Sequence, residues 1–161
     1  MSNDALLDLL RSKARLTSQE IADRLGLAAA EVESRMMELE KSGVVLGYQA
    51  VVNQEEVENE RVSALIEVKV TPEKGGGFDK MAKRISKFDH VTSCYLMSGG
   101  YDLMVVVSGK DLRAVAQFVS SKLSSMEGVL STATHFRLKT YKENNFLYEQ
   151  DSESDRLSVT P

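Results

Sequence analysis

Cysteine is nearly absent from this chain: Cys94 is the single one in 161 residues. One thiol excludes an intramolecular disulfide and any metal site built from several cysteines. The sequence also lacks an apolar run near 20 residues, which excludes a membrane-spanning helix. Its start, MSNDALLDLLRSK, has no basic segment followed by a long apolar stretch, so it shows no secretory signal and we expect a cytoplasmic protein.

Residues for catalysis and metal binding are equally scarce. His90 and His135 lie far apart in the sequence, and no cluster of histidine and carboxylate residues has the spacing of metal ligands. The segment 98–100 is not a nucleophile elbow, and the segment 74–77 lacks the Lys-Ser/Thr ending of a phosphate loop. We therefore expect no enzyme activity, no catalytic residue, no metal and no cofactor.

An excess of basic charge is missing too. The chain has 20 Lys and Arg against 24 Asp and Glu, a formal net charge of −4. This balance argues against a protein whose whole surface binds nucleic acid, but it leaves room for a small DNA-binding module. The most acidic segment is 141–161, which we predict to be a solvated C-terminal tail.

What the sequence does contain is a clear helical pattern over its first part. Apolar residues recur at helical spacing, and the run Thr17-Ser18-Gln19-Glu20 has the form of a capping box that opens a second helix. Gly26 ends that helix, and a third helix runs from about Ala29 to Ser42 with an inward stripe at Val32, Met36 and Leu39. Helix, short glycine turn, helix indicates a helix-turn-helix domain over residues 1–52, closed by a strand at 44–52.

The pattern changes after a polar segment at 53–61, which we interpret as a linker. From residue 62 to 140 alternating apolar strands and amphipathic helices follow in the order βαββαβ, which is typical of a ferredoxin-like domain. The fold class is therefore α+β. The third strand of this domain is apolar on both faces, so we expect a second copy to cover the free face of the sheet and form a homodimer.

An ordered set of short motifs resembles the Lrp/AsnC (feast/famine) family of transcription regulators, and most closely a Bacillus-type subgroup. In the first domain the run 16–27 (LTSQEIADRLGL) and the run 43–50 (GVVLGYQA) carry the resemblance; in the second, 98–103 (SGGYDL) and 128–134 (GVLSTAT) do. It spans roughly residues 4–140. The resemblance implies a winged-type helix-turn-helix joined to a ligand-sensing (RAM) domain, in a dimer that often assembles to an octamer and binds double-stranded DNA, with an amino acid as effector.

The candidate DNA-binding residues lie at the start of the second helix and along the third: Ser18, Ala28, Ala30, Glu31, Ser34, Arg35 and Lys41. The family usually has serine where this chain has Ala28. The third helix also carries four glutamates against Arg35 and Lys41, so we expect weak DNA binding per domain. Arg35 can contact DNA, or it can pair with Glu31 or Glu38 within the helix; both interpretations stay open.

The candidate effector site is the turn between two strands, with hydroxyls from the last strand: Ser98, Gly99, Gly100, Tyr101, Asp102, Thr132 and Thr134. Exposed backbone amides in the turn can hold a carboxylate, and Asp102 can hold an amino group, which suits an α-amino acid. The alternative is purely structural: the glycines make the turn, Tyr101 packs, and the threonines only pair in the strand.

Two other functions stay open at this point. One is an amino-acid sensor or assembly partner with little DNA binding. The other is an enzyme like the sirohaem decarboxylases, which resemble this family. Those enzymes usually show an Arg-Arg-Ile-Gly-Ala-like stretch where this chain has Val45-Leu46-Gly47-Tyr48-Gln49-Ala50, and basic residues to hold a carboxylated tetrapyrrole are scarce here.

Overall fold

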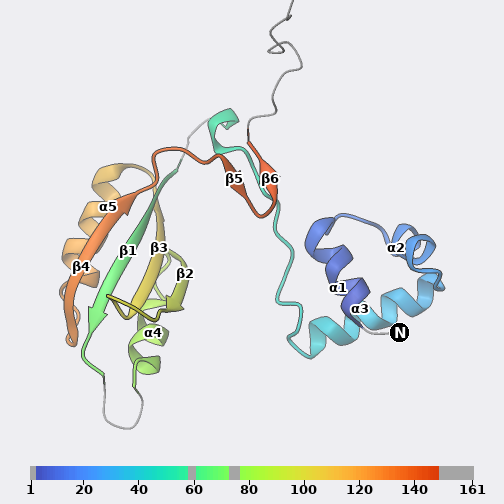
Figure 1. Cartoon of the computed structure of the whole chain (residues 1–161), viewed down its shortest axis with the longest axis horizontal. Coiled ribbons are helices and arrows are strands. Elements are labelled where there is room, and N and C mark those ends of the chain that lie inside the picture. Colours follow the sequence, from blue (N-terminus) through green and yellow to red (C-terminus); the bar gives the residue numbers. More distant parts are fainter. Residues whose placement is uncertain (1–2, 58–60, 73–76, 149–161) are drawn as a thin grey trace, which may run out of the picture. The chain divides into compact units, whose positions relative to one another are not determined.

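The computed structural model describes residues 3–57, 61–72 and 77–148. The chain divides into two compact units, Met1–Val51 and Val52–Pro161, which are described separately (Figure 1). The first unit is helical and the second is a four-stranded sheet with helices, so the predicted α+β class is confirmed. No helix in the described ranges is long and apolar enough to cross a membrane.

The first unit contains three helices: α1 (Asn3–Ser12), α2 (Ser18–Leu25) and α3 (Ala29–Lys41). The capping box at the start of α2 is present, because the Thr17 hydroxyl accepts from the Glu20 amide while the Glu20 carboxylate accepts from the Thr17 amide at 2.8 Å. Gly26 ends α2 with φ of +66°, a backbone conformation that costs glycine little. The three helices pack around one core, whose buried residues are Leu6, Leu10, Ile21, Ala22, Val32 and Leu39.

The strand predicted at 44–52 is wrong. The described chain after α3 makes a turn, in which the amides of Val44 and Val45 both donate to the Leu39 carbonyl at 3.0 Å, and then continues without strand pairing to residue 53. The residue types favour a strand, but a strand also needs a neighbour to take up its backbone hydrogen bonds. Leu46 is 94% exposed, although the preceding Val45 packs against the helical core.

The second unit is built on one antiparallel sheet of β1 (Val62–Val70), β2 (Val91–Leu96), β3 (Leu103–Gly109) and β4 (Val129–Phe136). The strand order is β2-β3-β1-β4, and the order along the chain is βαββαβ, which confirms the ferredoxin-like prediction. At the centre, Ile66 of β1 lies opposite Val105 of β3 and Thr134 of β4.

Helices cover one face of this sheet. They are α4 (Asp79–Ile85) and α5 (Leu112–Phe118), the latter continued by the π-helical turn η2 (Val119–Leu123) (Figure 1). Alternate β3 residues, including Val105 and Val107, are fully buried against them, while Met104 and Val106 on the other face are only half-buried. The register places Leu65 beside Val106 and Tyr95 beside Met104, so apolar side chains are left uncovered on the second face in the single chain, next to the pair of Glu67 and His135.

Residues 142–147, predicted to lie in a solvated tail over 141–161, are mostly exposed but have regular structure. They form a hairpin of β5 (Lys142–Glu143) and β6 (Phe146–Leu147), joined by two asparagines with positive φ. This is the backbone of a two-residue hairpin turn, in which asparagine is favoured. The remainder of the predicted tail, 149–161, lies outside the described residues.

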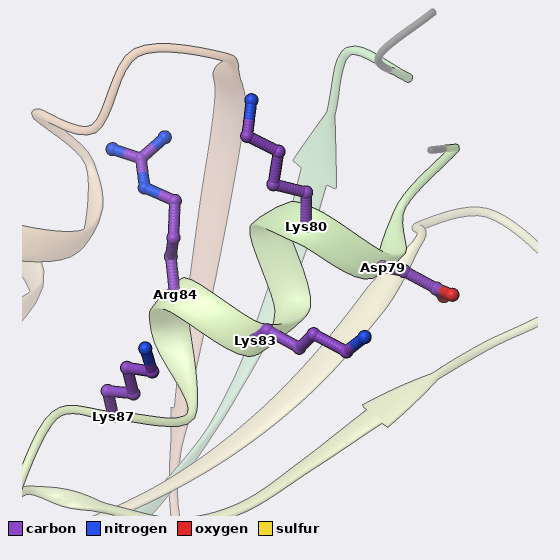
Figure 2. Close-up of a pocket in the computed structure, with 5 residues that line it drawn as sticks. All are labelled: Asp79, Lys80, Lys83, Arg84 and Lys87. Atoms are coloured by element: carbon purple, nitrogen blue, oxygen red, sulfur yellow. The ribbon is translucent and has the colours of Figure 1, made fainter. Parts of the chain in front are cut away.

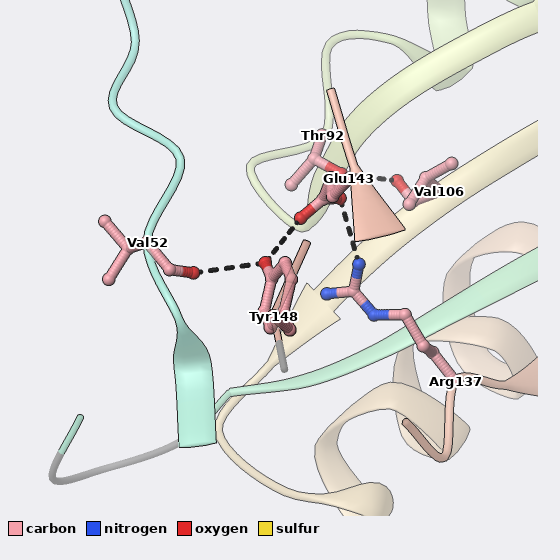
Figure 3. Close-up of polar contacts among 6 residues, drawn as sticks. All are labelled: Val52, Thr92, Val106, Arg137, Glu143 and Tyr148. Carbon is pink, nitrogen blue, oxygen red and sulfur yellow. Dashed lines mark hydrogen bonds and ion pairs between the residues drawn. The ribbon is translucent and has the colours of Figure 1, made fainter. Parts of the chain in front are cut away.

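Polar side chains anchor the hairpin (Figure 3). The Tyr148 hydroxyl lies 2.9 Å from a carboxylate oxygen of Glu143 and 3.2 Å from the carbonyl of Val52, so its single proton can serve either acceptor. Arg137 donates to the other Glu143 oxygen at 3.1 Å. The bond to Glu143 raises the pKa of Tyr148 above its usual value. The hairpin is thereby joined to the first residue of this unit.

Candidate DNA-binding face and effector loop

The outward face of α3 is defined by a spacing of four, three and four residues. Ala30, Ser34, Met37 and Lys41 follow this spacing and are all exposed, opposite the buried Val32 and Leu39. Three of the four were candidates from the sequence. Met37, 62% exposed, was not, although its place outside the inward stripe could have indicated it. A thioether at this position offers an apolar contact, of the kind that recognises a thymine methyl.

Arg35 is held within the helix in the single chain. Its Nη2 lies 2.5 Å from Oε1 of Glu31, one turn back, and only 25% of its side chain is exposed. The structure therefore contains the intrahelical pair that was one of the two interpretations of Arg35. A phosphate contact by this guanidinium would require it to leave Glu31.

The helix starts offer few donors to an anion. Ala28 occupies the N-cap of α3, and its methyl group makes no capping hydrogen bond. A phosphate at this helix end would meet backbone amides without a side-chain hydroxyl beside them. At α2 the half-buried Ser18 stands next to the capping box, which places the Glu20 carboxylate at the same helix end. The hydrogen bonds from Thr17 lower the pKa of Glu20, so this end carries a negative charge at neutral pH.

The far end of α3 is tied to the segment that follows it. Tyr48 donates a hydrogen bond to Oε1 of Glu40 at 2.9 Å. Partial burial is the larger cause and this bond the smaller cause of a raised pKa of Tyr48. Lys41 is exposed beside Glu40. Glu40, one of the four glutamates of α3, therefore has a structural role, because its carboxylate holds the segment that follows the helix.

The candidate effector loop joins β2 to β3. Ser98, Gly99 and Gly100 are exposed and Tyr101 is half-buried. The loop is closed by a bond from the Met97 amide to the Asp102 carbonyl at 2.8 Å. The exposed backbone at the tip offers donors to a carboxylate, but neither depression described on this unit includes the loop.

Asp102 has a structural task that the sequence did not reveal. One of its carboxylate oxygens accepts from the Val70 amide at 2.9 Å, and its own amide donates to the Val68 carbonyl at 3.1 Å. Both bonds attach the loop to the end of β1. The side chain predicted to hold an amino group is thus already used to position the loop.

Thr132 and Thr134 lie across β1 from this loop. They pair with Val68 and Ile66, which are buried against the helices, so both hydroxyls belong to the helix-covered face. The Thr132 hydroxyl is 3.0 Å from that of Ser124, just after η2. Val68 therefore brings Asp102 and Thr132 to the same end of the sheet, while Thr134 lies two residues farther along β4.

Two depressions are described on the second unit, and neither includes the candidate effector residues. One of about 440 Å³ lies on α4 and is lined by Asp79 and four basic side chains (Figure 2). The other, of about 580 Å³, includes Arg61, His90 and Lys110. Among the described residues no group of three or more His, Cys, Asp or Glu is arranged to hold a metal ion.

The two units match two domain models of known proteins. Residues 5–45 match a winged helix-turn-helix DNA-binding domain, and residues 63–147 match the Lrp/AsnC ligand binding domain. The protein is thus a regulator with a DNA-binding and a ligand-binding domain. This chain belongs to the Lrp/AsnC family of transcriptional regulators, as its motifs indicated.

Curated relatives share this organisation over nearly their whole length. An uncharacterized HTH-type transcriptional regulator, YugG of Bacillus subtilis, is 43% identical over 97% of this chain and 95% of that protein, in agreement with the predicted Bacillus-type subgroup. The leucine-responsive regulatory protein of Klebsiella pneumoniae is 26% identical over 88% of this chain and 86% of its own. These relatives are regulators, which agrees with the expectation of a non-enzyme.

Solved structures agree with the fold. A transcriptional regulator of Neisseria meningitidis in complex with L-Met, NMB0573, is 29% identical, with a TM-score of 0.69 over 86% of this chain and 89% of that one. The leucine response regulatory protein of Mycobacterium tuberculosis is 27% identical, with a TM-score of 0.72 over 90% and 96%.

Proposed function

We propose that this protein is a homodimeric regulator that reads DNA with α3 and changes its assembly or DNA binding when an amino acid binds beside the loop 98–102. The observation that carries the proposal is the joining of a helix-turn-helix with an exposed α3 face to a ligand-binding domain in one chain. A regulator works where the DNA is, so we propose the cytoplasm as its location.

The proposed DNA contacts are the exposed stripe of α3 and its flanks. Ser34 and Ala30 are small enough to let the helix approach base edges, and Met37 adds an apolar contact. Lys41 and a released Arg35 supply phosphate contacts, with Ser18 and the backbone at Ala28 at the helix starts. Because the four glutamates oppose phosphates, we expect each domain to bind weakly and the dimer to gain affinity by holding two domains on one duplex.

The dimer is proposed from the uncovered sheet face. Leu65 and Tyr95 are exposed by 37% and 54%, and they surround the half-buried Met104 and Val106. A second copy of the same sheet is the simplest cover for such a face, and a two-fold dimer places two α3 helices for a palindromic site. The segment 44–52, rich in strand-forming residues but unpaired, adds a further edge that a second copy can pair with, and octamers of four such dimers follow as the larger assembly.

The effector is proposed to be an α-amino acid, with L-methionine as the first candidate because a relative of similar fold was crystallised with it. The exposed loop of Ser98, Gly99 and Gly100 offers backbone donors for the carboxylate, and Tyr101 offers an apolar wall. Since neither depression described on this unit includes the loop, we propose that a second copy closes the site. Asp102 positions the loop against the end of β1. Thr132 and Thr134 lie across β1 with their hydroxyls on the helix-covered face, so we assign them a structural role in β4.

Thermal melting with each of the twenty amino acids, paired with a duplex-binding titration, tests this proposal. A ligand that binds the folded state raises the melting temperature with concentration. We expect one or a few amino acids to raise it and to change DNA binding as well. Stabilisation by an amino acid without any DNA binding would favour the alternative of a sensor or assembly partner.

A further inference from the structure

One strongly basic surface lies outside the helix-turn-helix. Four side chains of α4 and the turn after it line the depression of about 440 Å³, and we call them the α4 basic patch: Lys80, Lys83, Arg84 and Lys87 (Figure 2). Their spacing of three, one and three residues keeps them on the solvent side of the helix, because Met81 and Ile85 are buried under it. One carboxylate, Asp79, lines the same depression, which leaves an excess of three positive charges (four minus one).

Three of the four side chains of the patch carry charge that no described carboxylate neutralises. Lys83, Arg84 and Lys87 make no ion pair with any described carboxylate, and all three are exposed. Figure 2 shows Lys80 and Arg84 extending from the same side of the helix, with the Asp79 carboxylate pointing away from them. Like charges this close repel one another, so a compensating anion stabilises the arrangement.

We propose that the α4 basic patch binds the phosphate backbone of the same DNA duplex that the helix-turn-helix reads. The chemistry fits phosphates rather than bases: lysine and arginine on an open surface act as point charges and forks for phosphate oxygens, and no aromatic side chain in the depression could stack on a base. The rise from Lys80 to Arg84 is about 6 Å along the helix, comparable to the rise of two nucleotides, about 3.4 Å each, along the axis of a duplex.

Charge distribution between the two units favours DNA as the occupant. On α3 four glutamates face two basic residues, Arg35 and Lys41, and Arg35 is paired with Glu31. The helix that reads DNA is therefore poor in free positive charge, while α4 is rich in it. The two units belong to one chain, so a duplex held by the first unit is at high local concentration for the second. This inference rests on the DNA binding of the first unit and adds a contact that does not depend on sequence.

Salt dependence of binding to a random-sequence duplex tests the inference with the full-length protein. Each phosphate contact adds about 0.9 to the slope of log K against log salt. We expect the double variant Arg84→Gln/Lys87→Gln to flatten this slope by about 2 to 4 for a dimer and to weaken binding at least about tenfold at 0.1 M salt. The matched control is Arg113→Gln/Lys122→Gln, which removes the same charge from exposed positions on α5 and η2 and is expected to change the slope by less than about 1.

The outcomes separate the possible explanations. An unchanged slope in the patch variant, with wild-type protein binding normally, would overturn the inference and leave the proposed function intact. The same loss of duplex binding in the patch variant and in the control would show an effect of net charge alone and would also overturn the inference. A smaller assembly of the patch variant by light scattering, with unchanged duplex binding, would overturn it too, because the patch would then join copies of the protein. Wild-type protein that binds no duplex would contradict the proposed function itself.

Discussion

Replacing Glu31 by glutamine should strengthen DNA binding while it weakens the fold. Glu31 holds Arg35 at 2.5 Å and places a negative charge on the face of α3 proposed to meet DNA. Glutamine keeps the size and the helix-forming tendency of the side chain but removes the charge. Arg35 is then released, so the same substitution changes two interactions at once.

The magnitudes follow from general values for a helix ion pair and for two charges in water. An exposed ion pair one turn apart stabilises a helix by about 0.3–0.5 kcal/mol, and a carboxylate in the first turn adds a similar interaction with the helix dipole, so the free energy of unfolding should fall by about 0.5–1 kcal/mol. A charge about 7 Å from a phosphate contributes about 0.6 kcal/mol of repulsion in water before screening. Removing it and releasing Arg35 should gain about 0.5–1 kcal/mol per domain, and about 1–2 kcal/mol for two domains on one duplex, which is about 5- to 30-fold in affinity.

Fluorescence anisotropy with a labelled duplex measures the affinity, and urea unfolding measures the stability. Glu33→Gln is the matched control, because Glu33 is exposed on the same helix and no ion pair to a described residue involves it. The double variant Glu31→Gln/Arg35→Gln should lose the gain. Glu33→Gln removes the same charge without releasing an arginine, so its gain should be smaller than that of Glu31→Gln. An equal gain would refute the role of the released Arg35, and a folded Glu31→Gln protein with unchanged affinity would refute the reasoning as a whole.

Three further predictions concern the folding signals, the effector loop and the dimer. Thr17→Ala should lower the free energy of unfolding by about 1 kcal/mol in urea titrations, and Thr17→Ser should not. The pKa of Glu20 is lowered from 4.5, so the contribution of this capping box is present above that pH and is lost as the pH falls below it. Thr17→Ala should remove this acid sensitivity. Asp102→Asn should keep the bond from the Val70 amide and the melting temperature, whereas Asp102→Ala should lower the free energy of unfolding by about 1–3 kcal/mol because it leaves that amide unpaired. Loss of amino-acid binding in Asp102→Asn, measured by calorimetry, would show that the charge itself binds the ligand. Retained binding would leave Asp102 with a positioning role only. Val106→Glu should give a monomer by light scattering while Leu130→Glu, at an exposed position of β4, should not; a dimer in both would contradict the proposed interface.

The sequence predicted those elements whose signals are local. The capping box at Thr17 and the left-handed Gly26 mark the ends of α2 without reference to the rest of the chain, and the alternation in β1 fixes which of its faces is buried. The prediction of a strand at 44–52 was wrong because strand propensity in a sequence does not show whether a neighbouring strand is present to pair with it. The hairpin at 142–147 was overlooked because the acidic composition of the last residues outweighed the turn signal of Asn144 and Asn145.

The candidate sites were harder to predict, because their roles depend on contacts across the fold or with other molecules. The bond between Asp102 and the Val70 amide joins residues 32 positions apart and cannot be inferred from spacing. Arg35 had two plausible partners, and the single chain contains the one within its own helix. The effector loop and the open sheet face are incomplete without a second copy, so their chemistry is set by the assembly.

The central claim is that this Lrp/AsnC family member regulates transcription by binding DNA through its helix-turn-helix. A titration of the full-length protein against a duplex from the region upstream of its own gene, at 50 and 200 mM salt, tests it most directly. We predict a complex that weakens steeply as salt rises and that Ser34→Glu, which places a charge on the outward face of α3, abolishes. No salt-sensitive complex at micromolar protein, or an equally strong complex with Ser34→Glu, would contradict it.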